Sequence, residues 1–202
     1  MTPVWLHGWP LDERMWDRQV AAFGGVAERL YGRGNSIDDW ATQLLGELPG
    51  DELALVGASM GGYAALAIAR RAPERVAAIV LAASKAASDT PERKETRAEL
   101  IERLRVEGPP ENAAAGVGVD ELIVCQEAIR DRPDLTSVVT SFRGVLVACA
   151  GTEDDIVLTE DAFELAGLAE DGRPYVFAGA GHFLNLDQPE EFDAMISESL
   201  TL

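Results

Sequence analysis

Apolar residues along this chain gather in short uninterrupted runs, and each run is followed by a turn or by a segment with helical spacing. Six such runs are present, the second of them weak: residues 4–6, 26–31, 53–56, 76–82, 144–150 and 174–178. Strands that are apolar on both faces are typical of a parallel sheet covered by helices on both sides. The pattern therefore predicts an α/β fold with a mostly parallel, doubly wound sheet.

The segments between these runs carry apolar residues three or four positions apart, which is the period of an amphipathic helix. The clearest stripe extends from Ile37 to Leu48, and Ser36 directly before it is a good N-cap residue. Further helices are predicted at residues 11–23, 63–70, 159–169 and 189–200. Strands and helices thus alternate through most of the chain.

This alternation is interrupted between residues 85 and 141, where no strand is evident. The interrupted part is highly charged at its start, and it carries one amphipathic helix around Leu100 and a second at 120–130. We expect it to form a small helical cap inserted into a single α/β core. The predicted core consists of residues 1–84 and 142–202.

Gly57, Ser59 and Gly61 form a G-x-S-x-G pattern between the apolar run 53–56 and a helical segment. A strand that turns at once into a helix holds its central residue in a strained conformation, and flanking glycines allow so tight a turn. The serine oxygen is then exposed, and the N–H of Met60 faces any anion formed there. A glycine-rich turn with an incidental serine is the alternative at this point.

Ser59, Asp154 and His182 each follow a different predicted strand, at the sheet edge where open α/β sheets place their sites. A serine hydroxyl becomes a good nucleophile only when a base takes its proton, and imidazole is such a base near neutral pH. A carboxylate on the other ring nitrogen fixes the tautomer. The sequence therefore predicts a Ser-His-Asp catalytic triad.

The loop after the first strand contains His7 and Trp9. We expect the backbone N–H of Trp9 to join that of Met60 in an oxyanion hole, and we interpret His7 as a structural residue that orients the loop. Several side chains are candidates for an apolar acyl pocket, with ordinary core packing as the alternative: Trp9, Met60, Tyr63 and Phe183.

In this order, the motifs resemble the α/β-hydrolase superfamily, and its small esterase-like members in particular. The likeness covers nearly the whole chain, and residues 126–134 resemble the lead-in from cap to core of such members. Five motifs carry it: His7-Gly8-Trp9-Pro10, the distant echo Gly32-Arg33-Gly34-Asn35-Ser36 of a G-x-G-x-S loop, the elbow Gly57–Gly61, the G-x-x-D of Gly151–Asp154, and Gly179-Ala180-Gly181-His182. The resemblance implies Asp154 as the triad acid because it occupies the fourth place of G-x-x-D, with Asp155 as the alternative. It also implies an α/β-hydrolase fold that is shortened at its N-terminus, since the first strand begins near residue 4.

From these features we expect a serine hydrolase that cleaves a small, largely uncharged carboxylic ester through an acyl-enzyme intermediate. The same triad could act on a lactone, a thioester or a carbon–carbon bond, or in perhydrolysis. A ligand-binding protein on a hydrolase fold is a further alternative, because fold and function are separable. We expect neither a cofactor nor a metal ion, and a small-molecule substrate as the partner.

The composition limits the remaining function classes. Thirty-five acidic residues against 17 basic ones give a formal charge of −18, which argues against nucleic acid or an anionic membrane as a partner. Cys125 and Cys149 have neither metal-ligand nor redox spacing, so we expect free thiols. With no secretory signal evident at the start, a cytoplasmic location is predicted, while the oligomeric state is left open.

Overall fold

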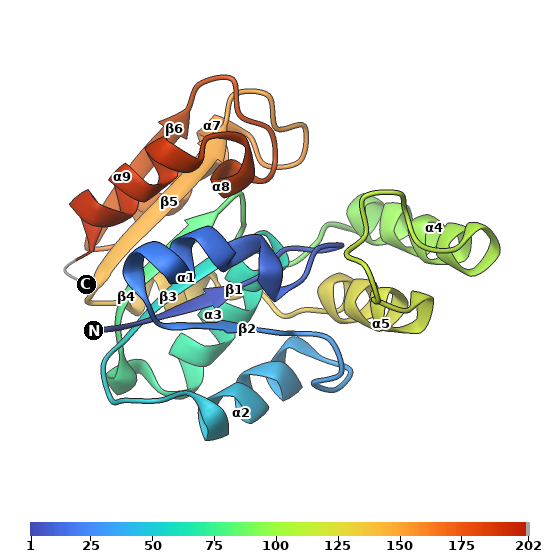
Figure 1. The fold of residues 1–202 in the computed structure, drawn as a ribbon, viewed down its shortest axis with the longest axis horizontal. Helices are drawn as coiled ribbons and strands as arrows, with labels where there is room; N and C mark the ends of the chain where they lie inside the picture. Colours follow the sequence, from blue (N-terminus) through green and yellow to red (C-terminus); the bar gives the residue numbers. More distant parts are fainter. Residues whose placement is uncertain (201–202) are drawn as a thin grey trace.

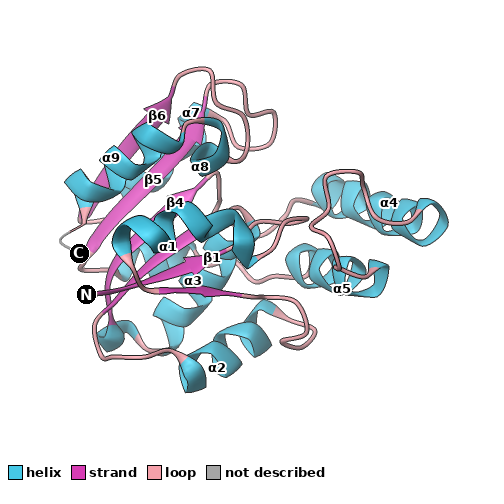
Figure 2. Cartoon of the chain, viewed as in Figure 1, coloured by secondary structure: helices cyan, strands magenta, loops and turns pink. Residues whose placement is uncertain are grey.

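A computed structural model describes residues 1–200, which form a six-stranded parallel sheet between two layers of helices (Figures 1 and 2). The strand order is β2-β1-β3-β4-β5-β6. The strands have these bounds: β1 Thr2–Leu6, β2 Val26–Glu28, β3 Leu53–Ala58, β4 Val76–Ala82, β5 Val145–Gly151 and β6 Asp171–Phe177. The predicted parallel, doubly wound α/β fold is confirmed.

The helices form one layer on each face of the sheet. One face is covered by α1 (Asp17–Phe23), which follows a 3₁₀ turn at Glu13–Trp16, and by α9 (Pro189–Ser199). The other face is covered by α2 (Ile37–Glu47), α3 (Met60–Arg71) and α7 (Thr159–Leu168). The sheet therefore separates two hydrophobic cores.

Strand β1 shows how one short segment supplies both cores. Successive side chains of a strand point to opposite faces of the sheet. Val4 and Leu6 pack in the core beneath α2 and α3, whereas Trp5 packs on the other face, with its ring centroid 5.5 Å from that of Trp16. Because both faces are buried, the sequence shows continuous apolar runs instead of an alternation.

Four segments differ from the sequence-based expectation, and one of them is β2, which ends at Glu28 instead of residue 31. β6 begins at Asp171 instead of residue 174, because an edge strand keeps much of its surface in solvent and its polar first residues hide the pattern. Two short helices were not anticipated, α6 (Thr136–Ser141) and α8 (Leu184–Asp187). With six and four residues, they are too short to show a helical period.

The two long helices of the predicted cap, α4 (Pro91–Glu107) and α5 (Val119–Arg130), pack against each other and project from the layered part of the molecule (Figure 1). Helix α6 also falls within residues 85–141, yet it packs against α3 and α7. The division into core and cap stays a prediction. Within residues 1–200, no helix combines the length and apolarity needed to cross a membrane.

Candidate active site

Ser59 connects β3 directly to α3 in a backbone conformation that is unusual for a residue with a side chain. Its φ is 48° and its ψ is −108°. A Cβ on Gly57 would lie 2.4 Å from the backbone of Gly61, and a Cβ on Gly61 would lie 2.0 Å from the carbonyl oxygen of Leu6. The two glycines thus allow the turn to close against β1, and the surrounding backbone holds Ser59 in its strained conformation.

Hydrogen bonds to β4, to the residues just after it and within α3 fix the backbone of Ser59 on both sides. Its N–H donates to the carbonyl oxygen of Ala82 at 2.8 Å. Its own carbonyl oxygen accepts from the hydroxyl of Ser84 at 2.8 Å and from the N–H of Gly62 at 2.9 Å. Ser84, which is buried, was not identified from the sequence, because no motif distinguishes it from other serines after a strand.

The side chains of Ser59, His182 and Asp154 form one continuous hydrogen-bonded chain. His182 Nε2 lies 2.8 Å from Ser59 Oγ, and His182 Nδ1 lies 2.7 Å from Asp154 Oδ2. A carboxylate only accepts hydrogen bonds, so Nδ1 carries the ring proton and Nε2 is free to accept the serine proton. The structure therefore brings together the three residues that the sequence analysis selected, and their hydrogen bonds match the geometry of a general base acting on a nucleophile.

Asp154 is fully buried, and its second oxygen accepts hydrogen bonds from the amides of Ile156 at 2.8 Å and Val157 at 3.2 Å. Burial alone raises the pKa of Asp154, but the hydrogen bond and charge of His182, together with these two amides, outweigh it and lower the pKa below its usual value. The carboxylate stays ionised at neutral pH. Asp155, the sequence-based alternative, is exposed and is not the residue bonded to His182.

The loop that carries His182 is fastened to its surroundings on either side. The N–H of Gly181 donates to Asp187 Oδ2 at 2.9 Å, and the N–H of Glu153 donates to the carbonyl oxygen of Ala180 at 2.9 Å. The second bond joins the loop of the histidine to the loop of the acid. Phe183 packs edge-on against the imidazole, with the ring centroids 5.3 Å apart.

The N–H groups of Trp9 and Met60, the predicted oxyanion donors, make no hydrogen bond to another group within residues 1–200. Met60 is the first residue of α3, where backbone N–H groups have no partner inside the helix and favour negative charge. The indole of Trp9 donates to the carbonyl oxygen of Leu122 at 3.3 Å and so connects this loop to α5. The two N–H groups are thus available to an anion, and their role in an oxyanion hole stays a prediction.

His7 is buried beneath the same loop and is hydrogen-bonded through both ring nitrogens. Its Nε2 accepts from the N–H of Leu30 at 2.9 Å, which leaves Nδ1 to donate to the carbonyl oxygen of Gly8 at 3.1 Å. Burial lowers the pKa of His7 from 6.5 to about 4, against the raising effect of its bond to Gly8 and of nearby Asp12. A neutral imidazole in this position fixes the backbone on either side of it.

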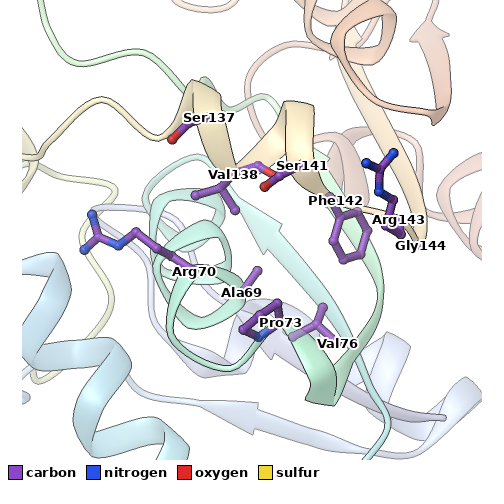
Figure 3. A pocket seen from close by; sticks show the side chains of 10 residues that line it. All are labelled: Ala69, Arg70, Pro73, Val76, Ser137, Val138, Ser141, Phe142, Arg143 and Gly144. Atoms are coloured by element: carbon purple, nitrogen blue, oxygen red, sulfur yellow. The ribbon is translucent and has the colours of Figure 1, made fainter.

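Two cavities differ sharply in their relation to these residues. The one in Figure 3 has a volume of about 440 Å³ and lies between the end of α3, α6 and the starts of β4 and β5. It is at the amino ends of the strands, away from Ser59. The second, of about 400 Å³, is bordered by Tyr63, one helical turn after the elbow, and by Ile156 and Val157, which hold Asp154.

A model of the alpha/beta hydrolase family matches residues 4–195, which is nearly the whole chain. The chain belongs to the alpha/beta hydrolase family. The recognition made from the elbow and its companion motifs is thereby confirmed at the level of the family.

Solved structures of other proteins share the fold along nearly the whole chain. An esterase from Thermogutta terrifontis is 25% identical with a TM-score of 0.83, and the match covers 98% of this chain and 89% of that one. An esterase from Exiguobacterium antarcticum is 23% identical with a TM-score of 0.82, with coverage of 98% and 91%. These neighbours support the predicted hydrolase fold and are esterases by description.

A curated relative matches more locally. The pimeloyl-[acyl-carrier protein] methyl ester esterase of Aromatoleum aromaticum is 38% identical over an alignment of 88 residues, and the match covers 39% of this chain. The matched stretch spans only 35% of that relative's own length. What that protein acts on therefore does not carry over to this hydrolase as a finding.

Two of the aromatic residues predicted to contact substrate, Phe183 and Tyr63, lie in different parts of the site. Phe183 lies beside His182, and a Cβ on Gly8 would lie 2.8 Å from its ring. Tyr63 lines the cavity of about 400 Å³, where the guanidinium of Arg132 lies 4.1 Å from its ring centroid. Sequence analysis did not identify the basic side chains of this cavity, because a charged segment does not reveal which of its residues face inward.

Among residues 1–200, no cluster of three or more potential ligands is arranged to hold a metal ion.

Proposed function

We propose that this hydrolase is a serine esterase that cleaves a small carboxylic ester through an acyl-enzyme intermediate, with Ser59, His182 and Asp154 as its triad. The observation that carries the proposal is the continuous chain of 2.8 Å and 2.7 Å contacts through the imidazole. It places a base at hydrogen-bond distance from the nucleophile, and a buried carboxylate on the base.

The reaction follows from this arrangement in two halves. Ser59 Oγ attacks the ester carbonyl carbon while His182 Nε2 takes the serine proton, and Asp154 stabilises the imidazolium. Collapse of the tetrahedral intermediate breaks the bond to the alcohol, which leaves with the proton from His182. A water molecule then attacks the acyl-enzyme with His182 again as the base, and the acid is released with Ser59 restored.

The negative charge on the carbonyl oxygen needs donors that are already in place. The unpaired N–H groups of Met60 and Trp9 supply them in this proposal, since one lies at the first turn of α3 and the other in the loop after β1. Loss of a single donor of this kind raises the barrier by about 3–4 kcal/mol in other hydrolases. Because these donors are backbone groups, side-chain substitution leaves them intact.

A carboxylic ester is favoured by the esterases among the structural neighbours and by the methyl ester esterase that matches part of the chain. Lactones, thioesters and carbon–carbon bonds place an equivalent carbonyl against the same triad. A panel of these substrates ranks them by kcat/KM. The proposal requires an ester to rank first.

The decisive experiment combines turnover with active-site labelling. Purified protein is assayed on short-chain nitrophenyl esters and exposed to a fluorophosphonate probe, and Ser59→Ala is compared with Ser141→Ala, which removes a hydroxyl at the end of α6. We expect Ser59→Ala to lose turnover and labelling, and Ser141→Ala to keep both. Turnover retained in Ser59→Ala would contradict the mechanism. A wild-type protein that is neither labelled nor active would indicate a ligand-binding protein instead.

A further inference from the structure

The cavity lined by Ile156 and Val157, whose amides hold Asp154, carries a charge opposite to that of the whole protein. It occupies about 400 Å³ between the segment leading into α4 and the core residues Tyr63, Ile156 and Val157. Four basic side chains line it against two carboxylates, which gives a formal local charge of +2 in a chain whose total is −18: Lys85, Arg93, Arg97 and Arg132 against Asp89 and Asp161. The sequence-based expectation of a largely uncharged substrate takes no account of this lining.

Most of these charges already have partners. Arg97 and Arg132 share the buried carboxylate of Asp89, with Arg132 Nη1 2.7 Å from Asp89 Oδ1. Lys85 Nζ lies 2.9 Å from Asp161 Oδ2. Two arginines on one carboxylate leave an excess of one positive charge, so the paired groups do not neutralise the cavity.

Arg93 differs from the other three basic residues. Its guanidinium makes no ion pair or side-chain hydrogen bond with any residue in the described range 1–200, although it is only partly exposed and lines the cavity. Arg132 adds a second unused donor, since its Nε is buried without a hydrogen-bond partner in that range. A guanidinium presents its N–H groups as a planar fork that matches the two oxygens of a carboxylate.

We propose that this cavity binds a carboxylate carried by the substrate, so that the preferred ester is a half ester of a dicarboxylic acid. Arg93 holds the free carboxylate, and the ester group at the other end of the acyl chain reaches Ser59. This assignment rests on the proposed esterase function and deepens it. In this proposal Tyr63 and Val157 line the passage between the two ends: both line the cavity, Tyr63 lies one helical turn after Ser59 on α3, and the N–H of Val157 donates to Asp154.

The test compares two series of methyl esters that differ only in the far end of the acyl chain. One series consists of monomethyl esters of linear dicarboxylic acids of increasing length, and the other of methyl esters of the matching monocarboxylic acids. The quantity measured is the ratio of kcat/KM for the half ester to kcat/KM for its neutral counterpart. We expect this ratio to exceed one at the chain length that fits the passage.

Two variants of α4 locate the effect. Arg93→Gln removes the unpaired guanidinium from the cavity, whereas Arg103→Gln removes the same charge from an exposed position outside it. We expect Arg93→Gln to lower the ratio by roughly tenfold or more, as the loss of a hydrogen bond between charged groups does, and Arg103→Gln to keep it. Thermal denaturation verifies that both variants are folded.

A separate binding measurement distinguishes this inference from the proposed chemistry. Calorimetry on the Ser59→Ala protein compares the affinity for a half ester with that for its neutral counterpart, without turnover. A ratio near one in the wild-type protein, or a ratio that Arg93→Gln and Arg103→Gln change equally, would overturn the carboxylate site. Failure of the protein to hydrolyse any ester would instead overturn the esterase proposal, and tighter binding of the half ester would still support the site.

Discussion

The hydroxyl of Ser84 donates a 2.8 Å hydrogen bond to the carbonyl oxygen of Ser59, across the gap between the end of β4 and the elbow. Ser84 is 3% exposed, and a Cβ on Gly62 would lie 2.3 Å from its oxygen. The absence of a side chain at Gly62 thus gives Ser84 the room to reach the strained residue. This contact acts on the backbone of Ser59 and leaves its nucleophilic side chain free.

Ser84→Ala is expected to weaken the elbow without removing any group that touches substrate. The lost hydrogen bond costs about 1 kcal/mol of stability, and kcat falls while KM changes little, because the nucleophile is held less firmly for the chemical step. Steady-state kinetics and urea unfolding measure both effects. Ser141→Ala is the matched control, since its hydroxyl donates to the carbonyl oxygen of Val138 far from the elbow. Equal kinetics for the two variants would show that Ser84 has no positioning role.

Gly61→Ala is expected to disrupt the fold at the elbow. The added Cβ would lie 2.0 Å from the carbonyl oxygen of Leu6, and a backbone atom of a central strand cannot move aside as a flexible side chain does. We expect a loss of at least about 3 kcal/mol in unfolding free energy, or no soluble protein. Gly46→Ala in α2 meets no atom within 4 Å and should raise the unfolding free energy by roughly 0.5–1 kcal/mol. A Gly61→Ala protein as stable as the wild type would contradict this account.

Interior strands and the elbow were readable from the sequence because burial on both faces leaves a continuous apolar run. β3 is buried along all its residues, and its run pointed directly to Ser59. The start of β6 was missed because its first residues are polar. Asp171 and Arg173 lie on an edge strand, where they are hydrogen-bonded to each other and remain accessible to solvent. Local pattern therefore reveals elements that lie in the core better than those at its edges.

The residues that the structure brings together in the candidate site were predictable from the sequence, whereas the lining of the neighbouring cavity was not. Chain order and strand ends pointed to Ser59, His182 and the acidic loop after β5, and the family resemblance selected Asp154 over Asp155 within that loop. The basic cavity depends on which side of α4 faces the core and on Arg132, 39 positions after Arg93 along the chain. Helix packing brings these basic side chains into one cavity, and the charged faces of the helices show no sequence period that would reveal it.

The variants Asp154→Asn and Asp155→Asn distinguish the catalytic contributions of two neighbouring carboxyl groups. Asp154 accepts the bond from His182 Nδ1 at 2.7 Å, and an amide in its place can hold the imidazole in the wrong tautomer. We expect kcat to fall by about 10⁴-fold in Asp154→Asn. Asp155 is exposed, so its variant should retain kcat within about twofold. Similar losses in both variants would mean that the carboxylate acts through general electrostatics.

The buried imidazole of His7 should make stability depend on pH between 6.5 and about 4. In that range the unfolded chain binds a proton at this residue while the folded protein does not, so stability falls as pH decreases through the window. The full effect is on the order of 3 kcal/mol. This loss of stability is complete below the folded pKa of about 4, and no loss occurs above 6.5. The depressed pKa of Asp154 acts in a lower range, because its contribution is lost only as pH falls below 3.8.

His7→Gln isolates this effect, since glutamine offers one acceptor to Leu30 N–H and one donor to the Gly8 carbonyl but does not titrate. Urea unfolding of wild type and variant across the window measures the two slopes. We expect the variant to be less stable at neutral pH and to lose less stability on acidification, because only the wild type must bury a charge or unfold. Parallel slopes would show that His7 keeps an ordinary pKa in the fold, and that its two hydrogen bonds, rather than its neutrality, are what the loop before Trp9 requires.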